Sequence, residues 1–166
     1  MKGQFLIDTG ADTSCVGAGF VVLSETGRTA SLSGYNDRSN ATEIVPIVSA
    51  VTAYDGHPTI LLVMNEVINL GPNQKTSLLN LNQVRDAGHR TDDIPHFFPG
   101  ASIFGIDTNN GIHIPFRLEG KSCVLDVRTP TDFELNNSKR IELTSKSRWT
   151  PHKSDWEKIE NNFKGL

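Results

Sequence analysis

The sequence lacks the features that mark several common classes of protein. It has 2 cysteines, Cys15 and Cys123, and neither stands at metal-ligand spacing from the other or from a histidine. Isolated cysteines are typical of a reducing compartment rather than of a disulfide framework. No apolar run approaches the roughly 18 residues of a membrane-spanning helix. Met1 to Gln4 lead into an apolar strand rather than into a signal peptide. We therefore expect a cytoplasmic protein with no membrane partner and no metal.

The charge is too balanced to indicate a nucleic-acid-binding protein. The 16 basic and 19 acidic residues give a formal net charge of -3. The nearest basic cluster, Lys139-Arg140, is too short to form a patch. We therefore expect no direct contact with nucleic acid. The length of 166 residues suits one domain, with or without an extension.

What the sequence does contain is a succession of short β patterns separated by turn residues. The polar stretch 33–40 lies between two β-rich segments, which predicts a long hairpin with an exposed tip. Asp55-Gly56 predicts a tight turn, and the continuous apolar run 59–70 predicts a buried strand. Leu78, Leu81 and Val84 are spaced by three, so we expect a short helix over 77–87 that ends at Gly88. Further strands are predicted over 5–7, 16–23, 30–32 and 42–54, with a turn over 25–28.

Residues 91–166 are predicted to form an extension of a first domain, 1–90. Residues 89–102 are rich in turn residues and predict a loop. Alternating apolar and polar residues predict a hairpin over 112–127. A helical turn over 130–135 and a strand over 141–143 follow. Ser154 and Glu157 form a capping box, so a helix is expected over 154–163. The predicted fold is all-β, with one short helix and a C-terminal hairpin-plus-helix extension.

The stretch from Phe5 to Asp12 carries the chemistry. A carboxylate such as Asp8, at the end of a buried strand, can activate water if a second carboxyl group lies about 3 Å away, because two such groups share one proton. Thr9 can hydrogen-bond across to its mate in the second loop, Gly10 allows the backbone to approach a substrate, and Ala11 is small where a substrate would pass. Asp-Thr-Gly alone is a common surface turn. The preceding Phe-Leu-Ile and the following Ala-Asp favour the functional interpretation.

At these residues the chain resembles the retropepsins, the aspartic proteases of retroviruses and long-terminal-repeat retrotransposons. Their active-site sequence is two apolar residues followed by Asp-Thr-Gly-Ala-Asp, which Asp8 to Asp12 match residue by residue. The resemblance implies that Asp8 is catalytic, that Thr9 holds two interlocked loops, and that Gly10, Ala11 and Asp12 bind substrate. It also implies a small closed β barrel and a homodimer with one aspartate from each chain. Water is then the nucleophile, no cofactor is needed, and the substrate is the element's own polyprotein, in the cytoplasm or in virus-like particles.

Other landmarks follow in the order that this family has. Gly34, Tyr35 and Asn36 stand at the tip of the predicted long hairpin, where the family has its substrate-covering flap. Leu79 lies in a segment that resembles the apolar-apolar-Gly element before the last helix, and the resemblance places it among the substrate-binding residues. Asn80 stands where retroviral enzymes usually carry glycine. The segments 63–66, 78–83 and 128–132 look more like copia-type polyproteins.

The resemblance covers roughly residues 4 to 90 and leaves alternatives open. Only seven residues precede Asp8, whereas the family usually has a further strand there, so either the domain boundary is trimmed or the dimer contact differs. An inactive retropepsin-like dimer that binds peptides is the main rival function, and a monomeric remnant of a decayed element is another. Ile106-Asp107-Thr108 echoes the first motif, as in a bilobal enzyme, but Asn109 and Asn110 replace Gly-Ala.

Overall fold

The computed structural model describes residues 1–8, 12–32, 43–100 and 103–150. Strands predominate in these residues, and the two helices are short, so the predicted all-β class is confirmed. None of the helices in these ranges is long and apolar enough to span a membrane. The elements are β1 (Lys2–Ile7), β2 (Cys15–Val16), β3 (Val21–Leu32), β4 (Glu43–Tyr54), β5 (Ile60–Asn69), β6 (Thr76–Leu79), α1 (Leu81–Asp86), β7 (Arg90–Asp92), β8 (Gly105–Asp107), β9 (His113–Pro115), β10 (Arg117–Glu119), β11 (Ser122–Arg128), α2 (Asp132–Asn137) and β12 (Arg140–Glu142).

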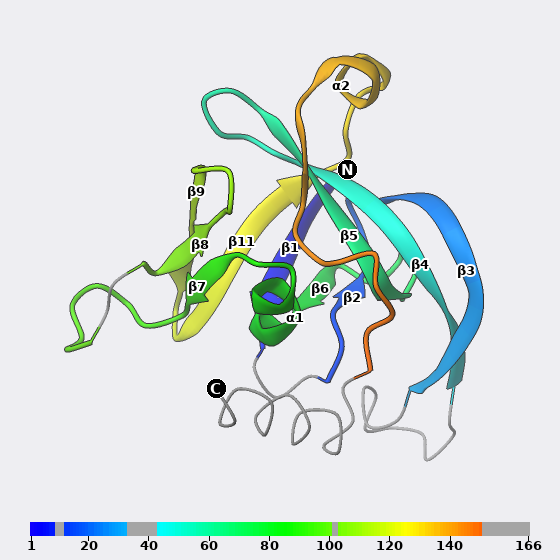
Figure 1. Cartoon of the computed structure of the whole chain (residues 1–166), viewed down its shortest axis with the longest axis horizontal. Coiled ribbons are helices and arrows are strands. Elements are labelled where there is room, and N and C mark those ends of the chain that lie inside the picture. Colours follow the sequence, from blue (N-terminus) through cyan, green and yellow to red (C-terminus); the bar gives the residue numbers. More distant parts are fainter. Residues whose placement is uncertain (9–11, 33–42, 101–102, 151–166) are drawn as a thin grey trace, which may run out of the picture.

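Most strands belong to one sheet, whose order is β10-β11-β1-β6-β2-β5-β4-β3, with β12 paired to β5 (Figure 1). Strand β6 lies between β1 and β2, although those two strands are joined by the short segment 8–14. It runs parallel to β1 and antiparallel to β2. The strands before and after residues 8–14 therefore lie on either side of β6, and this arrangement positions the candidate site.

Residues beyond 90 share this sheet with the residues before it. Strand β11 runs antiparallel to β1, from Lys2↔Arg128 to Leu6↔Val124, and β12 runs parallel to β5. Strand β11 also meets β4 through Arg128↔Ala53, so the path of paired strands through β1, β6, β2, β5 and β4 returns to β11. The expected extension thus supplies three strands, β10, β11 and β12, to the sheet that contains β1.

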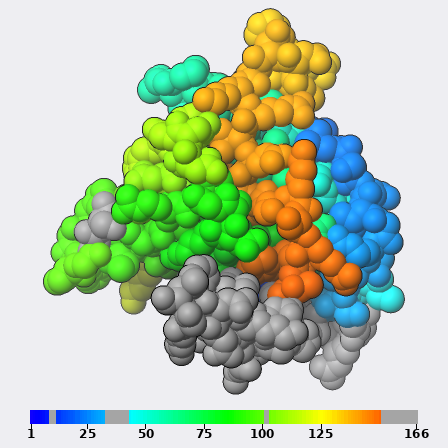
Figure 2. All heavy atoms as spheres, viewed as in Figure 1, coloured from blue at the N-terminus to red at the C-terminus, as the bar shows by residue number. Residues whose placement is uncertain are grey.

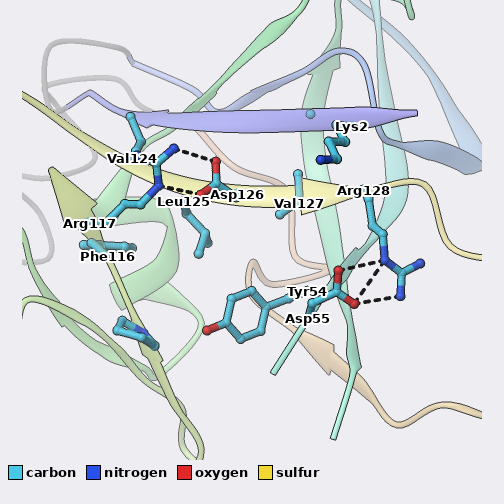
Figure 3. A pocket seen from close by; sticks show the side chains of 12 residues that line it. Lys2, Tyr54, Asp55, Phe116, Arg117, Val124, Leu125, Asp126, Val127 and Arg128 are labelled. Carbon is cyan, nitrogen blue, oxygen red and sulfur yellow. Dashed lines mark hydrogen bonds and ion pairs between the residues drawn. The ribbon is translucent and has the colours of Figure 1, made fainter. Parts of the chain in front are cut away.

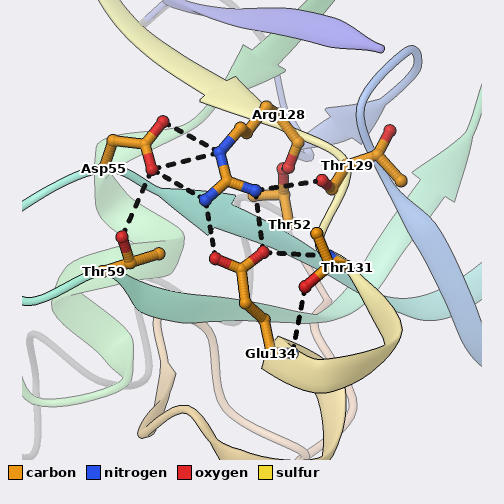
Figure 4. Close-up of polar contacts among 7 residues, drawn as sticks. All are labelled: Thr52, Asp55, Thr59, Arg128, Thr129, Thr131 and Glu134. Carbon is orange, nitrogen blue, oxygen red and sulfur yellow. Dashed lines mark hydrogen bonds and ion pairs between the residues drawn. The ribbon is translucent and has the colours of Figure 1, made fainter.

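Side chains reinforce the junction between β11 and β4. The Arg128 guanidinium donates to both carboxylate oxygens of Asp55 at 2.8–3.0 Å and to both of Glu134 at 2.6–2.7 Å (Figure 4). Glu134 also completes a capping box with Thr131 at the start of α2. The Arg128 guanidinium holds the pKa of Glu134 at about 2, and it also lowers the pKa of Asp55. This network ties α2 to the turn between β4 and β5.

The long hairpin and the buried strand are confirmed. Strands β3 and β4 pair antiparallel as far as Leu32↔Glu43, and β5 is buried along nearly its whole length. The predicted tip, Gly34 to Asn36, lies outside the described residues. The predicted strand over 16–23 is wrong in its bounds, because the chain bends at residues 17–20 between β2 and β3. The predicted turn over 25–28 is a register irregularity within β3 rather than an end of the strand.

Three further predictions need correction. The helix expected over 77–87 begins only at Leu81, because Thr76–Leu79 form β6 and pair with β1. The hairpin over 112–127 is divided: β10 pairs with β11, whereas β9 joins β7 and β8 in a separate three-stranded sheet. Strand β7 also lies inside the segment that was expected to be a loop. The helical turn near 130–135 and the strand near 141–143 are confirmed as α2 and β12. The helix expected over 154–163 lies outside the described residues.

Candidate active site

Asp8 lies directly after β1, at the carboxyl end of the parallel pair β1 and β6. Its backbone N–H donates to the carbonyl oxygen of Leu79 at 3.2 Å, which extends the pairing of the two strands by one residue. Phe5 and Ile7, on the alternate positions of β1, are buried in the main core, and Asp8 itself is partly buried. The apolar residues before Asp8 thus anchor its backbone at the end of a buried strand.

Helix α1 begins beside Asp8 because Asn80 caps it. The Asn80 side chain accepts hydrogen bonds from the backbone N–H groups of Asn82 at 2.8 Å and Gln83 at 3.2 Å. Asparagine is among the preferred residues at this position, since its side chain satisfies N–H groups that have no partner in the first helical turn. Asn80 therefore turns the chain from β6 into α1 next to Asp8.

The other end of the Asp8 loop, defined as residues 8–14, is held by two buried hydrogen bonds. The Ser14 hydroxyl accepts from the backbone N–H of Asn80 at 2.9 Å. The Ser14 N–H donates to the side-chain oxygen of Gln83 at 3.0 Å. Both ends of the loop are therefore attached to the junction of β6 and α1.

Gln83 connects this loop to a bulge in β5. Its side-chain nitrogen donates to the carbonyl oxygens of Asn65 at 3.3 Å and Glu66 at 2.8 Å. Asn65 and Glu66 oppose the single residue Ser49 of β4, and Glu66 has a φ of 57°. A positive φ is unfavourable for a residue with a side chain, and such positions concentrate at functional sites. The bulge exposes the two carbonyl groups to Gln83 instead of to the β4 ladder.

Cys15 lies close enough to Asp8 for the carboxylate to affect the pKa of its thiol. Burial, and to a lesser extent the nearby Asp8 carboxylate, raises the pKa of Cys15 to about 11. Its sulfur contacts the carbonyl oxygen of Thr13 at 3.6 Å. The thiolate is the nucleophilic form of cysteine. Cys15 therefore stays protonated near neutral pH and is unsuited to nucleophilic chemistry.

The structure describes three of the predicted site residues, Asp8, Asp12 and Leu79. Asp12 is exposed, and its carbonyl oxygen accepts a hydrogen bond from the indole N–H of Trp149 at 2.9 Å. Leu79 is fully buried in the main core, so in the single chain its side chain serves packing and its carbonyl holds Asp8. Thr9, Gly10, Ala11, Gly34, Tyr35 and Asn36 lie outside the described residues.

Asp107, the second aspartate considered from sequence, is in the other sheet. It ends β8, and its carboxylate contacts the imidazole of His113 at 2.6 Å. Its strand is paired on both sides, with β7 and β9. The structure thus places the two Asp-Thr motifs in different sheets.

Sequence reasoning missed Ser14, Gln83 and Trp149 as parts of this site. Gln83 is a polar residue of α1, yet it is only 1% exposed. Its partners are 69 and about 17 residues away along the chain, so no local pattern could reveal them. The contact of Trp149 with Asp12 spans 137 residues.

The pocket with a volume of about 620 Å³ between β1, β11 and the end of β4 is not at Asp8 (Figure 3). Tyr54, Phe116 and Leu125 line it, and the Arg117–Asp126 and Arg128–Asp55 pairs stand beside them. Neither Asp8 nor Asp12 is among its lining residues. In the described part of the chain, no three His, Cys, Asp or Glu side chains gather as metal ligands.

Comparison of the chain with protein-family models gave no match, and neither did comparison with curated proteins or with solved structures.

Proposed function

We propose that this chain is an aspartic endopeptidase of the retropepsin type, which processes a retroelement polyprotein as a homodimer. The observation that carries the proposal is the position of Asp8. It directly follows β1, whose Phe5 and Ile7 are buried, and the strands before and after residues 8–14 flank β6. A carboxylate at the end of a strand that is paired on both sides is held more precisely than one on an unsupported loop.

The sheet supports the finer assignment of a small closed barrel. The path of paired strands returns from β4 to β11, and the Arg128 network lies at that junction. Strand β1, which leads to Asp8, is paired on both sides, antiparallel with β11 and parallel with β6. This pairing favours the active enzyme over the inactive peptide-binding rival, since the strand that carries Asp8 is supported by a neighbour on each side.

The chemistry needs a second carboxyl group, which a second copy of the chain would provide. Asp8 of one copy, as carboxylate, accepts a proton from water while the water oxygen attacks the peptide carbonyl carbon. Asp8 of the other copy, as carboxylic acid, donates its proton to the carbonyl oxygen. Collapse of the tetrahedral intermediate breaks the C–N bond, and the amine nitrogen takes up a proton. No covalent intermediate with the enzyme forms.

The substrate would lie as an extended strand between the two copies, covered by their hairpins. Strands β3 and β4 extend this hairpin as far as Leu32 and Glu43, and Ile44 in its arm is 70% exposed. Closure of the hairpins would exclude water and pair with the peptide backbone.

The proposal is tested by peptide cleavage together with solution mass. Sedimentation should show a dimer, and the wild type should cleave members of a peptide library at mildly acidic pH. Asp8→Asn should reduce cleavage by at least about a thousandfold, as loss of an essential catalytic group does. Asp107→Asn is the matched control and should retain cleavage, because Asp107 contacts His113 in the other sheet.

Each alternative gives a different result. A dimer in which wild type and Asp8→Asn cleave equally little indicates the peptide-binding module, and the protease proposal fails. A monomer without cleavage indicates a remnant. A monomer that cleaves and loses activity in both aspartate variants indicates a bilobal enzyme.

A further inference from the structure

The segment after β12 runs along β5 to the candidate site. Figure 2 shows the chain that follows β11, in orange, as a band across the molecule between the green residues around α1 and the blue strand β3. The backbone N–H of Leu143 donates to the carbonyl oxygen of Val63 at 2.9 Å, which continues the pairing of β12 with β5. This path leads the segment to the bulge at Asn65 and Glu66.

Thr144 fixes the segment to the bulge through buried hydrogen bonds. Its hydroxyl oxygen lies 2.6 Å from both the N–H and the carbonyl oxygen of Asn65, accepting from the first and donating to the second. The Asn65 side-chain nitrogen donates to the carbonyl oxygen of Thr144 at 2.9 Å. Thr144 and Asn65 are at most 3% exposed. Buried and fully paired groups of this kind are costly to separate.

Glu66 binds the same segment at Trp149, five residues after Thr144. Its carboxylate accepts from the backbone N–H of Trp149 at 3.1 Å, and it also forms an ion pair with Arg28 of β3. Glu66 is 5% exposed although its backbone has a positive φ, where glycine would be less strained. The Glu66 side chain therefore has a role that glycine could not fill, because it joins Arg28 of β3 to the backbone of Trp149.

Trp149 then reaches the Asp8 loop itself. With its backbone held by Glu66, its indole N–H donates to the carbonyl oxygen of Asp12 at 2.9 Å. The loop is thus held at Asp8 by Leu79, at Ser14 by Asn80 and Gln83, and between them at Asp12 by Trp149.

We propose that Trp149 is a positioning residue, which holds the Asp8 loop against β5 and so sets the place of the Asp8 carboxylate in the catalytic pair. The catalytic part of this inference rests on the proposed protease function. The positioning role makes residues 144–149 a part of the enzyme rather than of a neighbouring polyprotein segment. An ångström of displacement of a reacting group can cost about a hundredfold in rate, so a loop that carries half of a catalytic pair benefits from a third attachment.

The attachment can be tested without any activity, because the two cysteines report on different parts of the chain. Cys15 follows the Asp8 loop and is buried, whereas Cys123 lies in β11. Trp149→Phe keeps an aromatic ring but removes the indole donor. Loss of one hydrogen bond should raise the rate of maleimide labelling of Cys15 about three- to tenfold through local opening, with Cys123 unchanged. The control is Phe133→Leu, a change at a ring that is 72% exposed on α2; it should alter neither rate.

The catalytic part is tested by kinetics of the same variants in the full chain. Trp149→Phe should lower kcat about tenfold and change KM much less, whereas Phe133→Leu should match the wild type. Equal acceleration at both cysteines, or none at Cys15, overturns the attachment. Accelerated Cys15 labelling with unchanged kcat overturns the positioning role. A wild type that labels as expected but cleaves no peptide refutes the protease function, and the positioning role with it, while the attachment stands.

Discussion

Gln83 is the residue whose replacement tests the construction of the site most directly. It is 1% exposed, and its amide makes three hydrogen bonds: from the Ser14 N–H, and to the carbonyl oxygens of Asn65 and Glu66. Gln83→Met keeps the length and flexibility of the side chain and removes all three bonds. The helix itself should survive, because methionine is a good helix former and Asn80 still caps α1.

The expected cost follows from which partners are left without a bond. A buried N–H without its partner, here that of Ser14, costs about 1–3 kcal/mol. The Asn65 carbonyl oxygen keeps its bond from the Thr144 hydroxyl, so its loss is small. The Glu66 carbonyl oxygen contributes about 1 kcal/mol more. We expect a free energy of unfolding lower by about 2–4 kcal/mol, which corresponds to a Tm lower by roughly 5–15 °C for a chain of this size.

Urea unfolding at a fixed protein concentration measures this loss, since the stability of an oligomer depends on concentration. Asn82→Ala is the matched control. Asn82 is on the same helix but exposed, and its side chain bonds only to the exposed Arg85, so stability should change by less than about 0.5 kcal/mol. Amide exchange at Ser14 should also quicken in Gln83→Met. If Gln83→Met loses less than about 1 kcal/mol and Ser14 exchange is unchanged, the hydrogen bonds of Gln83 do not hold the loop.

Two further substitutions test the sheet and its ion network. Gly3→Ala should lower the free energy of unfolding by about 1–3 kcal/mol in urea, because a Cβ at Gly3 would lie 2.1 Å from the carbonyl oxygen of Ala18; unchanged stability would contradict this close approach. Glu134→Gln should lower the Tm at neutral pH. Arg128 holds the pKa of Glu134 at about 2, so the pair stabilises the fold above the usual value of 4.5 and is lost as the pH falls through about 2. The difference in Tm between the wild type and Glu134→Gln, measured by circular dichroism, should therefore shrink as the pH falls towards 2. A difference that does not change with pH would refute the pairing.

Local patterns in the sequence were reliable where the physics is local. The alternation and turn residues between β3 and β5 predict a hairpin and a buried strand because neighbouring residues decide which face is apolar and where the chain turns. They failed at residues 77–79, where a helical period of three is overridden by pairing with β1. They failed again at 113–115, which pair with β8 instead of with β11. A local pattern predicts that a residue is buried, but it does not predict which strand packs or pairs with it.

For the candidate site, the sequence by itself determined the position of Asp8 after three apolar residues, two of which, Phe5 and Ile7, are buried in the structure. Only the tertiary structure decided what surrounds Asp8. It inserted β6 between the strands that the loop joins, placed β11 on the free edge of β1, and brought Gln83 and Trp149 to the loop from 69 and 137 residues away. These contacts depend on which distant segments bury each other best. Which segments pair depends on the packing of the whole core, which must outweigh the entropy lost when long loops close. No single segment of the chain contains that information.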